Sequence, residues 1–188
     1  MLKNIYSEKI KFFNKNLHQN KTLIIDESNQ NYTKGDIFNF SERKIFSFKK
    51  KNLILFCGGN DSTSILYYLS FLINQQAVIL FDKDCDEEKI NYLIEKFKPD
   101  YIFKKSNFDV KNYDIINDNK EYFFLKHKFP SVTKINAKLA ILLSTSGSLK
   151  ESKFVKLSYE NIFENSLSIS KYLNLKSNDL SITTLPLF

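Results

Sequence analysis

The chain has 188 residues, of which 43% are hydrophobic and 15% aromatic, a composition that supports a sizeable core and excludes wholesale disorder. The length fits one domain or a domain and a half, and no apolar run reaches the roughly 18 residues that a membrane span requires. The net charge of +7 raises nucleic acid as a partner, but Arg43 is the sole arginine and the lysines are scattered among Asp and Glu, so nucleic-acid binding is not predicted.

The first 50 residues predict a helix, two short strands and a second helix. Residues 1–20 place lysines and apolar residues at helical spacing. They lack the compact apolar block and cleavage site of a signal peptide, so a cytoplasmic location is expected. Residues 23–26 and 32–33 predict strands on either side of a polar turn, and Thr33 is expected to cap a helix over 34–48.

The middle of the chain alternates apolar runs with helical patterns. The runs at 52–56, 77–81 and 101–103 are continuously apolar, which is typical of strands buried on both faces. A helix is predicted over 63–74 with Asp61 or Ser62 as its cap, and another over 84–97. This alternation predicts an α/β fold: a doubly wound, mostly parallel sheet with helices on both faces.

The pattern weakens over residues 104–136, where an Asn- and Asp-rich loop, a strand at 122–125 and a second loop are predicted. Beyond it, 139–143 reads as a buried strand, 154–157 as a short strand, and 158–173 as a helix capped by Ser158. A last strand is expected at 180–185. Cys57 and Cys85 lie 28 residues apart and the two histidines are isolated, so neither a disulfide nor a metal site is predicted.

A loop of small and hydroxylated residues follows the strand at 139–143. Its sequence, STSGS at 144–148 with lysines at 150, 153 and 156, is suited to binding phosphate through backbone N–H groups, hydroxyls and a lysine. The Walker pattern is absent, because no Gly-Lys-Ser/Thr follows Gly147. The segment Cys57-Gly58-Gly59-Asn60-Asp61 likewise lacks the third glycine of a dinucleotide fingerprint. Both absences argue against another class of doubly wound nucleotide-binding domain, such as a kinase.

Residues 145–161 resemble the phosphate-binding loop of the adenylate-forming enzymes, the superfamily of acyl-CoA synthetases, adenylation domains and luciferases. The resemblance covers nearly the whole chain, including the strand pair at 23–33, the AVIL step at 77–80 and the LPLF segment at 185–188. It implies that the loop binds the β- and γ-phosphates of ATP. The residues that it assigns to this site are Thr145, Ser146, Gly147, Ser148 and Lys153.

The loop also departs from the superfamily pattern. Leu149 stands for a threonine, Lys150 and Phe154 for glycines, Ser152 for a proline, and Tyr159 for a histidine. Losing two glycines restricts the backbone, because other residues resist a positive φ. These departures keep open a rival interpretation, in which the chain is a degenerate, non-catalytic or partner-dependent module of the same fold.

The resemblance further implies that residues 1–188 form a single, partial N-terminal AMP-binding domain, without the remainder of the large domain and the C-terminal lid. The family activates a small carboxylic acid with ATP and Mg²⁺, then transfers it to coenzyme A or to a phosphopantetheine carrier such as acyl carrier protein. Its catalytic and metal-binding residues are expected beyond Phe188, so the chain alone is expected to be inactive. An unpaired sheet edge and an exposed apolar face would favour self-association.

Overall fold

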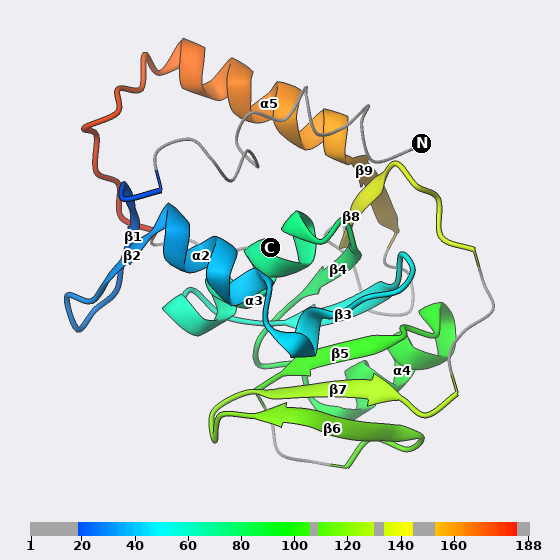
Figure 1. Ribbon diagram of the computed structural model, residues 1–188. Helices are drawn as coiled ribbons and strands as arrows, with labels where there is room; N and C mark the ends of the chain where they lie inside the picture. Colours follow the sequence, from blue (N-terminus) through cyan, green and yellow to red (C-terminus); the bar gives the residue numbers. More distant parts are fainter. Residues whose placement is uncertain (1–18, 106–108, 130–133, 145–152, 184–188) are drawn as a thin grey trace.

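The computed structural model describes residues 19–105, 109–129, 134–144 and 153–183 (Figure 1). These residues form a small two-stranded sheet and a seven-stranded sheet flanked by helices. The elements, in chain order, are β1 (Thr22–Ile25), β2 (Asn31–Thr33), α2 (Lys34–Ser41), the 3₁₀ helix η2 (Lys44–Phe46), β3 (Leu53–Cys57), α3 (Ser62–Ile73), β4 (Ala77–Phe81), α4 (Glu87–Phe97), β5 (Tyr101–Lys104), β6 (Tyr113–Asp118), β7 (Phe123–His127), β8 (Leu139–Ser144), β9 (Phe154–Ser158) and α5 (Tyr159–Tyr172).

The large sheet has the strand order β6-β7-β5-β3-β4-β8-β9. Its four central strands, β5, β3, β4 and β8, are parallel. The flanking strands pair antiparallel: β7 with β5, β6 with β7, and β9 with β8. The predicted parallel core is therefore confirmed, and antiparallel strands border it on both sides.

Helices cover both faces of this sheet, as the doubly wound prediction requires. One core lies between the sheet and α2, α3 and α5, and includes Tyr67 and Phe71 of α3. The other lies beneath α4, whose Ile90 and Leu93 are fully buried. Every residue of β3 is buried because the strand contributes to both cores, which explains its continuous apolar run.

Side-chain caps fix where the helices begin. Thr33 and Ser158 each form a capping box, with Asp36 and Asn161 respectively. Asp61 accepts a hydrogen bond from the Ser64 N–H at the start of α3. Thr33 and Ser158 were predicted as caps, and Asp61 was one of two predicted alternatives with Ser62. Each cap satisfies backbone donors that a helix leaves without an internal partner.

Three predicted elements need correction. The helix predicted over 34–48 ends at Ser41, and the 3₁₀ turn η2 then carries the Phe46 ring into the core, where it lies 5.8 Å from the ring of Phe71. The loop predicted after residue 104 contains a strand, β6, which pairs with β7. Residues 180–183 form no strand, and Leu180 and Ile182 are 79% and 85% exposed.

Two other predictions cannot be compared with the structure in full. The amphipathic helix over 1–20 falls mostly outside the described residues, as do residues 184 and 185 of the predicted last strand. Within the described parts of the chain, no helix is both long and apolar enough to cross a bilayer.

Candidate functional site

The parallel strands bring their carboxyl ends to one edge of the sheet. Ligands of open α/β sheets bind at this kind of edge, near the point where the strand order reverses. In this chain the reversal lies between β3 and β4, because β3 leads into α3 on one face of the sheet, whereas β4 leads into α4 on the other face and back to β5. The glycine-containing segment 58–61 follows β3, and the predicted phosphate loop follows β8 at the same edge.

The predicted phosphate-binding residues fall in the connection between β8 and β9. β8 and β9 pair antiparallel, with Ser144 opposite Phe154. Lys153 is exposed and directly precedes β9. The other predicted phosphate-binding residues, Thr145, Ser146, Gly147 and Ser148, lie outside the described residues, and their role stays a prediction.

Aromatic packing holds the base of this hairpin against α4. The ring of Phe154 makes an edge contact with Phe97, with 4.7 Å between centroids. The Lys96 ammonium lies 5.1 Å from the Phe154 ring centroid. Phe154 stands where the superfamily pattern has a glycine, so this substitution adds an anchor between β9 and α4.

Tyr159 has a structural role that sequence reasoning missed. Its hydroxyl donates a 2.6 Å hydrogen bond to the carbonyl of Gln76, just before β4, and its side chain is buried. Burial raises the pKa of the Tyr159 phenol. The Lys51 ammonium lies 5.0 Å from the ring centroid of Tyr159. Tyr159, which stands where the superfamily pattern has a histidine, thus links the start of α5 to the sheet.

A polar cluster surrounds the loop after β3. The Asp61 carboxylate accepts hydrogen bonds from the Ser64 hydroxyl at 2.9 Å and from the Tyr122 hydroxyl. Ser64 in turn accepts a 3.0 Å bond from the Gly59 N–H. Burial is the main cause that raises the pKa of Tyr122, which keeps this phenol protonated as a donor. The sequence indicated Asp61 or Ser62 as a cap, but the contact between Asp61 and Tyr122 depends on the pairing of β5 with β7.

Gly58 is required here by close packing. A Cβ at this position would lie 2.3 Å from the ring of Phe56, which is fully buried. Gly58 is therefore explained by the close packing of the loop on the Phe56 ring. This explanation needs no dinucleotide, and the segment has no dinucleotide fingerprint.

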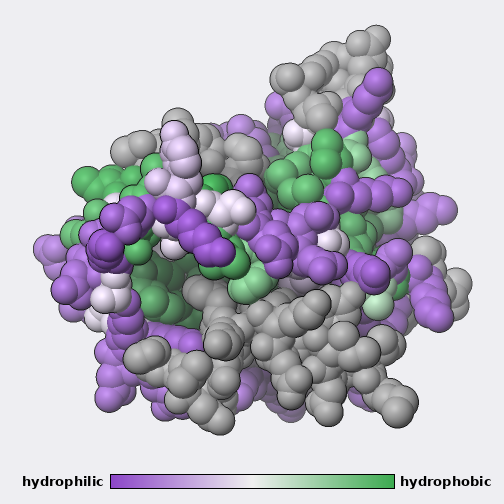
Figure 2. Space-filling model, turned by 90° about the horizontal axis from the view of Figure 1, so that it is seen from above, coloured by the Kyte–Doolittle hydropathy of each residue, from purple (hydrophilic) through white to green (hydrophobic). Residues whose placement is uncertain are grey.

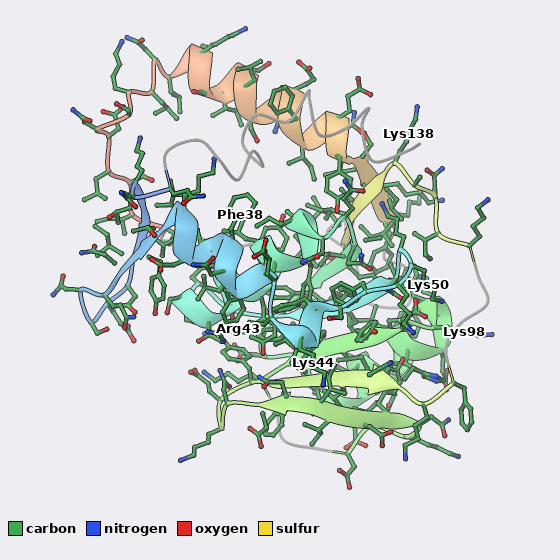
Figure 3. The ribbon with its side chains drawn as sticks, in the orientation of Figure 1. Phe38, Arg43, Lys44, Lys50, Lys98 and Lys138 are labelled. Carbon is green, nitrogen blue, oxygen red and sulfur yellow. The ribbon has the colours of Figure 1, made fainter. Side chains whose placement is uncertain are left out.

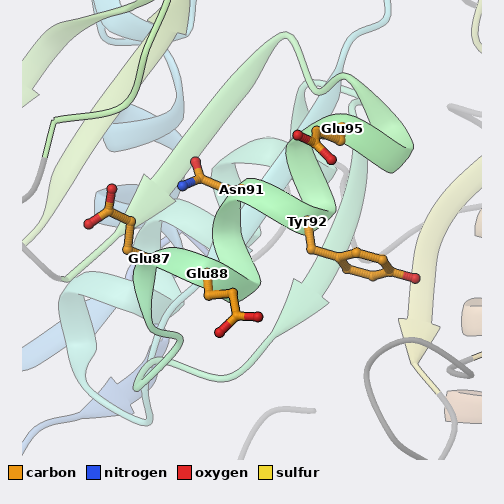
Figure 4. Close-up of a pocket in the computed structure, with 5 residues that line it drawn as sticks. All are labelled: Glu87, Glu88, Asn91, Tyr92 and Glu95. Carbon is orange, nitrogen blue, oxygen red and sulfur yellow. The ribbon is translucent and has the colours of Figure 1, made fainter.

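A cavity of about 620 Å³ opens along α4 (Figure 4). Its lining side chains all project from this one helix. Three carboxylates make the cavity a poor site for a polyphosphate anion. No group of three or more His, Cys, Asp or Glu residues suited to a metal ion occurs in the part of the chain that the structure describes. The cavity is lined by Glu87, Glu88, Asn91, Tyr92 and Glu95.

No protein-family model and no curated protein matches the sequence. Solved structures do match the fold. The o-succinylbenzoate CoA synthetase MenE from Bacillus subtilis, in complex with the acyl-adenylate intermediate OSB-AMP, superposes with a TM-score of 0.69 at 20% identity, covering 91% of this chain and 47% of the enzyme. Its complex with ATP and magnesium ion gives 0.68 at 18% identity, with coverages of 91% and 48%. Apo MatB from Rhodopseudomonas palustris gives 0.66 at 13% identity, with coverages of 90% and 38%.

At these identities the likeness shows the fold. The chain has the fold of the N-terminal portion of adenylate-forming enzymes, as the sequence resemblance implied. It spans less than half the length of the matched structures.

Proposed function

We propose that this chain is the N-terminal portion of an ATP-dependent carboxylate ligase. The complete ligase would activate a fatty, aryl or amino acid as an acyl-adenylate with release of pyrophosphate. It would then transfer the acyl group to coenzyme A or to a carrier-protein thiol.

One observation carries the proposal. The Ser-Gly-Ser and Lys153 pattern falls in the β8–β9 connection of a fold shared with an enzyme solved in complex with ATP and magnesium ion. The sequence motif and the fold were inferred from different features of the chain, and a motif match is meaningful when its structural context agrees.

In the proposed site the loop holds the leaving pyrophosphate. Hydroxyls and backbone N–H groups of residues 145–148 would donate hydrogen bonds to phosphate oxygens, and the Lys153 ammonium would offset the charge that develops on the leaving group. A bound Mg²⁺ would supply further charge neutralisation. The anchoring of Phe154 on α4 fixes the base of the hairpin and so limits how far Lys153 can move.

The chain alone is expected to bind the phosphates weakly and to catalyse nothing. Weak binding of ATP, with a Kd in roughly the millimolar range, is expected because the phosphate contacts are not joined by an assigned adenine or ribose site. Carboxylate-dependent exchange between ATP and pyrophosphate is therefore expected to stay at background level. Exchange clearly above background would overturn this expectation of inactivity.

The decisive experiment is a calorimetric titration of the chain with MgATP and with magnesium pyrophosphate. The Lys153→Ala variant should bind both ligands roughly tenfold more weakly, because it loses a charge-assisted contact. Lys138→Ala is the matched control. It removes the same charge from the other end of β8, where Lys138 is exposed (Figure 3), and should bind like the wild-type protein.

Two outcomes would count against the proposal. Equal weakening by Lys153→Ala and Lys138→Ala would mean that only overall charge matters. Absence of any binding by the folded protein would favour the degenerate module.

A further inference from the structure

The fold brings together the chain's only two cysteines, which the sequence left unpaired. Cys57 is the last residue of β3, and Cys85 lies four residues after β4, the strand next to it. Both side chains belong to the core beneath α4, with exposed fractions of 0% and 2%. The two thiols are close enough for Cys85 to raise the pKa of the Cys57 thiol. No other thiol exists in the sequence to compete with this pair.

The two thiols differ in how solvent can reach them. Cys57 sits inside the sheet, whereas Cys85 is the sole buried residue of the segment 82–88. The turn that holds it is closed by a 3.2 Å bond from the Cys85 N–H to the Asp82 carbonyl. The Asp84 N–H donates a second bond, of 2.9 Å, to the Asp82 carboxylate. Opening this short exposed turn would release Cys85 without separating any strands.

A cation lies beside the inner thiol. Lys104 of β5 pairs in register with Cys57 and is 1% exposed. Its charge favours the Cys57 thiolate, while the hydrogen bond to Cys85, burial and the charge of Asp82 all oppose ionisation. The net direction is a raised pKa for the Cys57 thiol, so the closed pair stays protonated.

We propose that Cys57 and Cys85 form a latent redox site, which closes to an intramolecular disulfide when a low-molecular-weight disulfide such as oxidised glutathione is present. The bond would join the end of β3 to the start of α4. It would also fasten the carboxyl edge of the sheet next to segment 58–61.

The reaction balances in two exchange steps. In the opened turn, the Cys85 thiolate attacks one sulfur of oxidised glutathione, forms a mixed disulfide and releases one glutathione thiolate. When the turn closes, the Cys57 thiolate attacks the Cys85 sulfur, forms the protein disulfide and releases the second glutathione thiolate. The two protein thiols lose two protons and two electrons, and the glutathione disulfide is reduced by the same two electrons.

The test treats the native chain with oxidised glutathione, then denatures it, alkylates free thiols and measures the intact mass. The expected product lacks two hydrogen atoms, carries no alkyl group and yields a peptide that links Cys57 to Cys85. Because the bond closes a long loop, the midpoint of thermal unfolding should rise by roughly 5–15 °C. Added dithiothreitol should reverse both changes.

The single variants test the order of attack. Cys57→Ser should accumulate a glutathione adduct on Cys85. Cys85→Ser should react far more slowly, because its remaining thiol, Cys57, lies inside the sheet and is not released when the turn opens. Equal rates in the two variants would contradict the proposed order. The proposal itself is overturned if the native wild-type chain ends with stable glutathione adducts, with disulfide-linked dimers, or with both thiols unreacted under conditions that form the bond in concentrated urea.

Discussion

Lys51 illustrates how an unremarkable lysine in the sequence acquires an unusual environment in the fold. It lies two residues before β3, and its ammonium donates a 2.8 Å hydrogen bond to the carbonyl of Ala137. The same group lies over the ring of Tyr159. Desolvation lowers the pKa of Lys51 to about 8 from its ordinary 10.5. The hydrogen bond and the ring favour the charged form, and they oppose part of this burial cost.

This shift predicts a stability change at alkaline pH. Below pH 8 Lys51 is protonated in both the folded and the unfolded chain, and the full cost of burying its charge is present. Between pH 8 and 10 the folded chain releases the proton first, so the unfolded chain binds more protons and the free energy of unfolding rises with pH. After allowance for solvent around the half-buried amine, we expect a rise of about 1 kcal/mol.

The measurement is urea unfolding at pH 7, 8, 9 and 10. Lys51→Met should abolish the rise, and Lys50→Met, its neighbour with the same charge, should keep it. Above pH 10 stability should fall again, because burial raises the pKa of several tyrosines, that of Tyr68 to about 12. An identical pH profile for wild-type protein and Lys51→Met would contradict the assignment to Lys51.

At the level of elements, Asp100 joins the starts of two neighbouring strands. Its carboxylate accepts a 3.1 Å hydrogen bond from the Leu53 N–H. It also forms a 3.3 Å ion pair with the ammonium of Lys50, which Figure 3 labels. Its own N–H donates to the Leu53 carbonyl at 2.8 Å. Asp100 is 4% exposed and Lys50 is half-exposed, so the bond to the buried N–H should outweigh the ion pair.

Two substitutions separate these contributions. Asp100→Ala leaves the Leu53 N–H buried without an acceptor and should cost about 2–3 kcal/mol of unfolding free energy. Asp100→Asn keeps an acceptor oxygen and loses only the charge, so it should cost about 1 kcal/mol or less. Urea denaturation of both variants at neutral pH shows whether the hydrogen bond to the Leu53 N–H or the charge on Asp100 contributes more to stability. Equal losses would assign the stabilisation to the charge on Asp100.

The elements that the sequence predicted well are those whose signals are local. β3, β4 and β8 are continuous apolar runs, and the caps Thr33 and Ser158 directly precede their helices. The strand β6 was missed because it lies at the edge of the sheet, where several residues are exposed and no apolar run marks it. The break after Ser41 was also missed, since it depends on where the Phe46 ring finds space in the core.

The site was predicted less completely, because its contacts join distant segments. The prediction of a phosphate-binding loop rests on local residue types in 144–153. The link from Tyr122 to Asp61, the bond from Tyr159 to Gln76 and the meeting of the two cysteines each require the strand order β7-β5-β3-β4-β8. That order follows from non-local pairing, which a residue pattern along the chain does not specify.

At the scale of the whole molecule, the described residues of α5 and of the segment after it expose large apolar side chains. Within the part of the chain that the structure describes, α5 packs on the sheet through its beginning, at Tyr159 and its neighbours. Figure 2 looks down on this side of the molecule and shows apolar surface broken by hydrophilic strips. An apolar surface of this kind marks an interaction site or a tendency to associate. The large apolar residues exposed here are Leu167, Ile169, Tyr172, Leu173, Leu175, Leu180 and Ile182.

This surface predicts that the isolated chain self-associates as its concentration rises. The double variant Leu167→Lys/Leu173→Lys adds two charges to the surface and should shift sedimentation equilibrium toward the mass of one chain. Leu23→Lys/Ile25→Lys is the matched control, because those residues of β1 are 41% and 47% exposed but lie on the separate small sheet. A wild-type protein that stays monomeric at high concentration would remove the basis for self-association, and an equal effect of both double variants would assign it to overall charge repulsion instead of to α5.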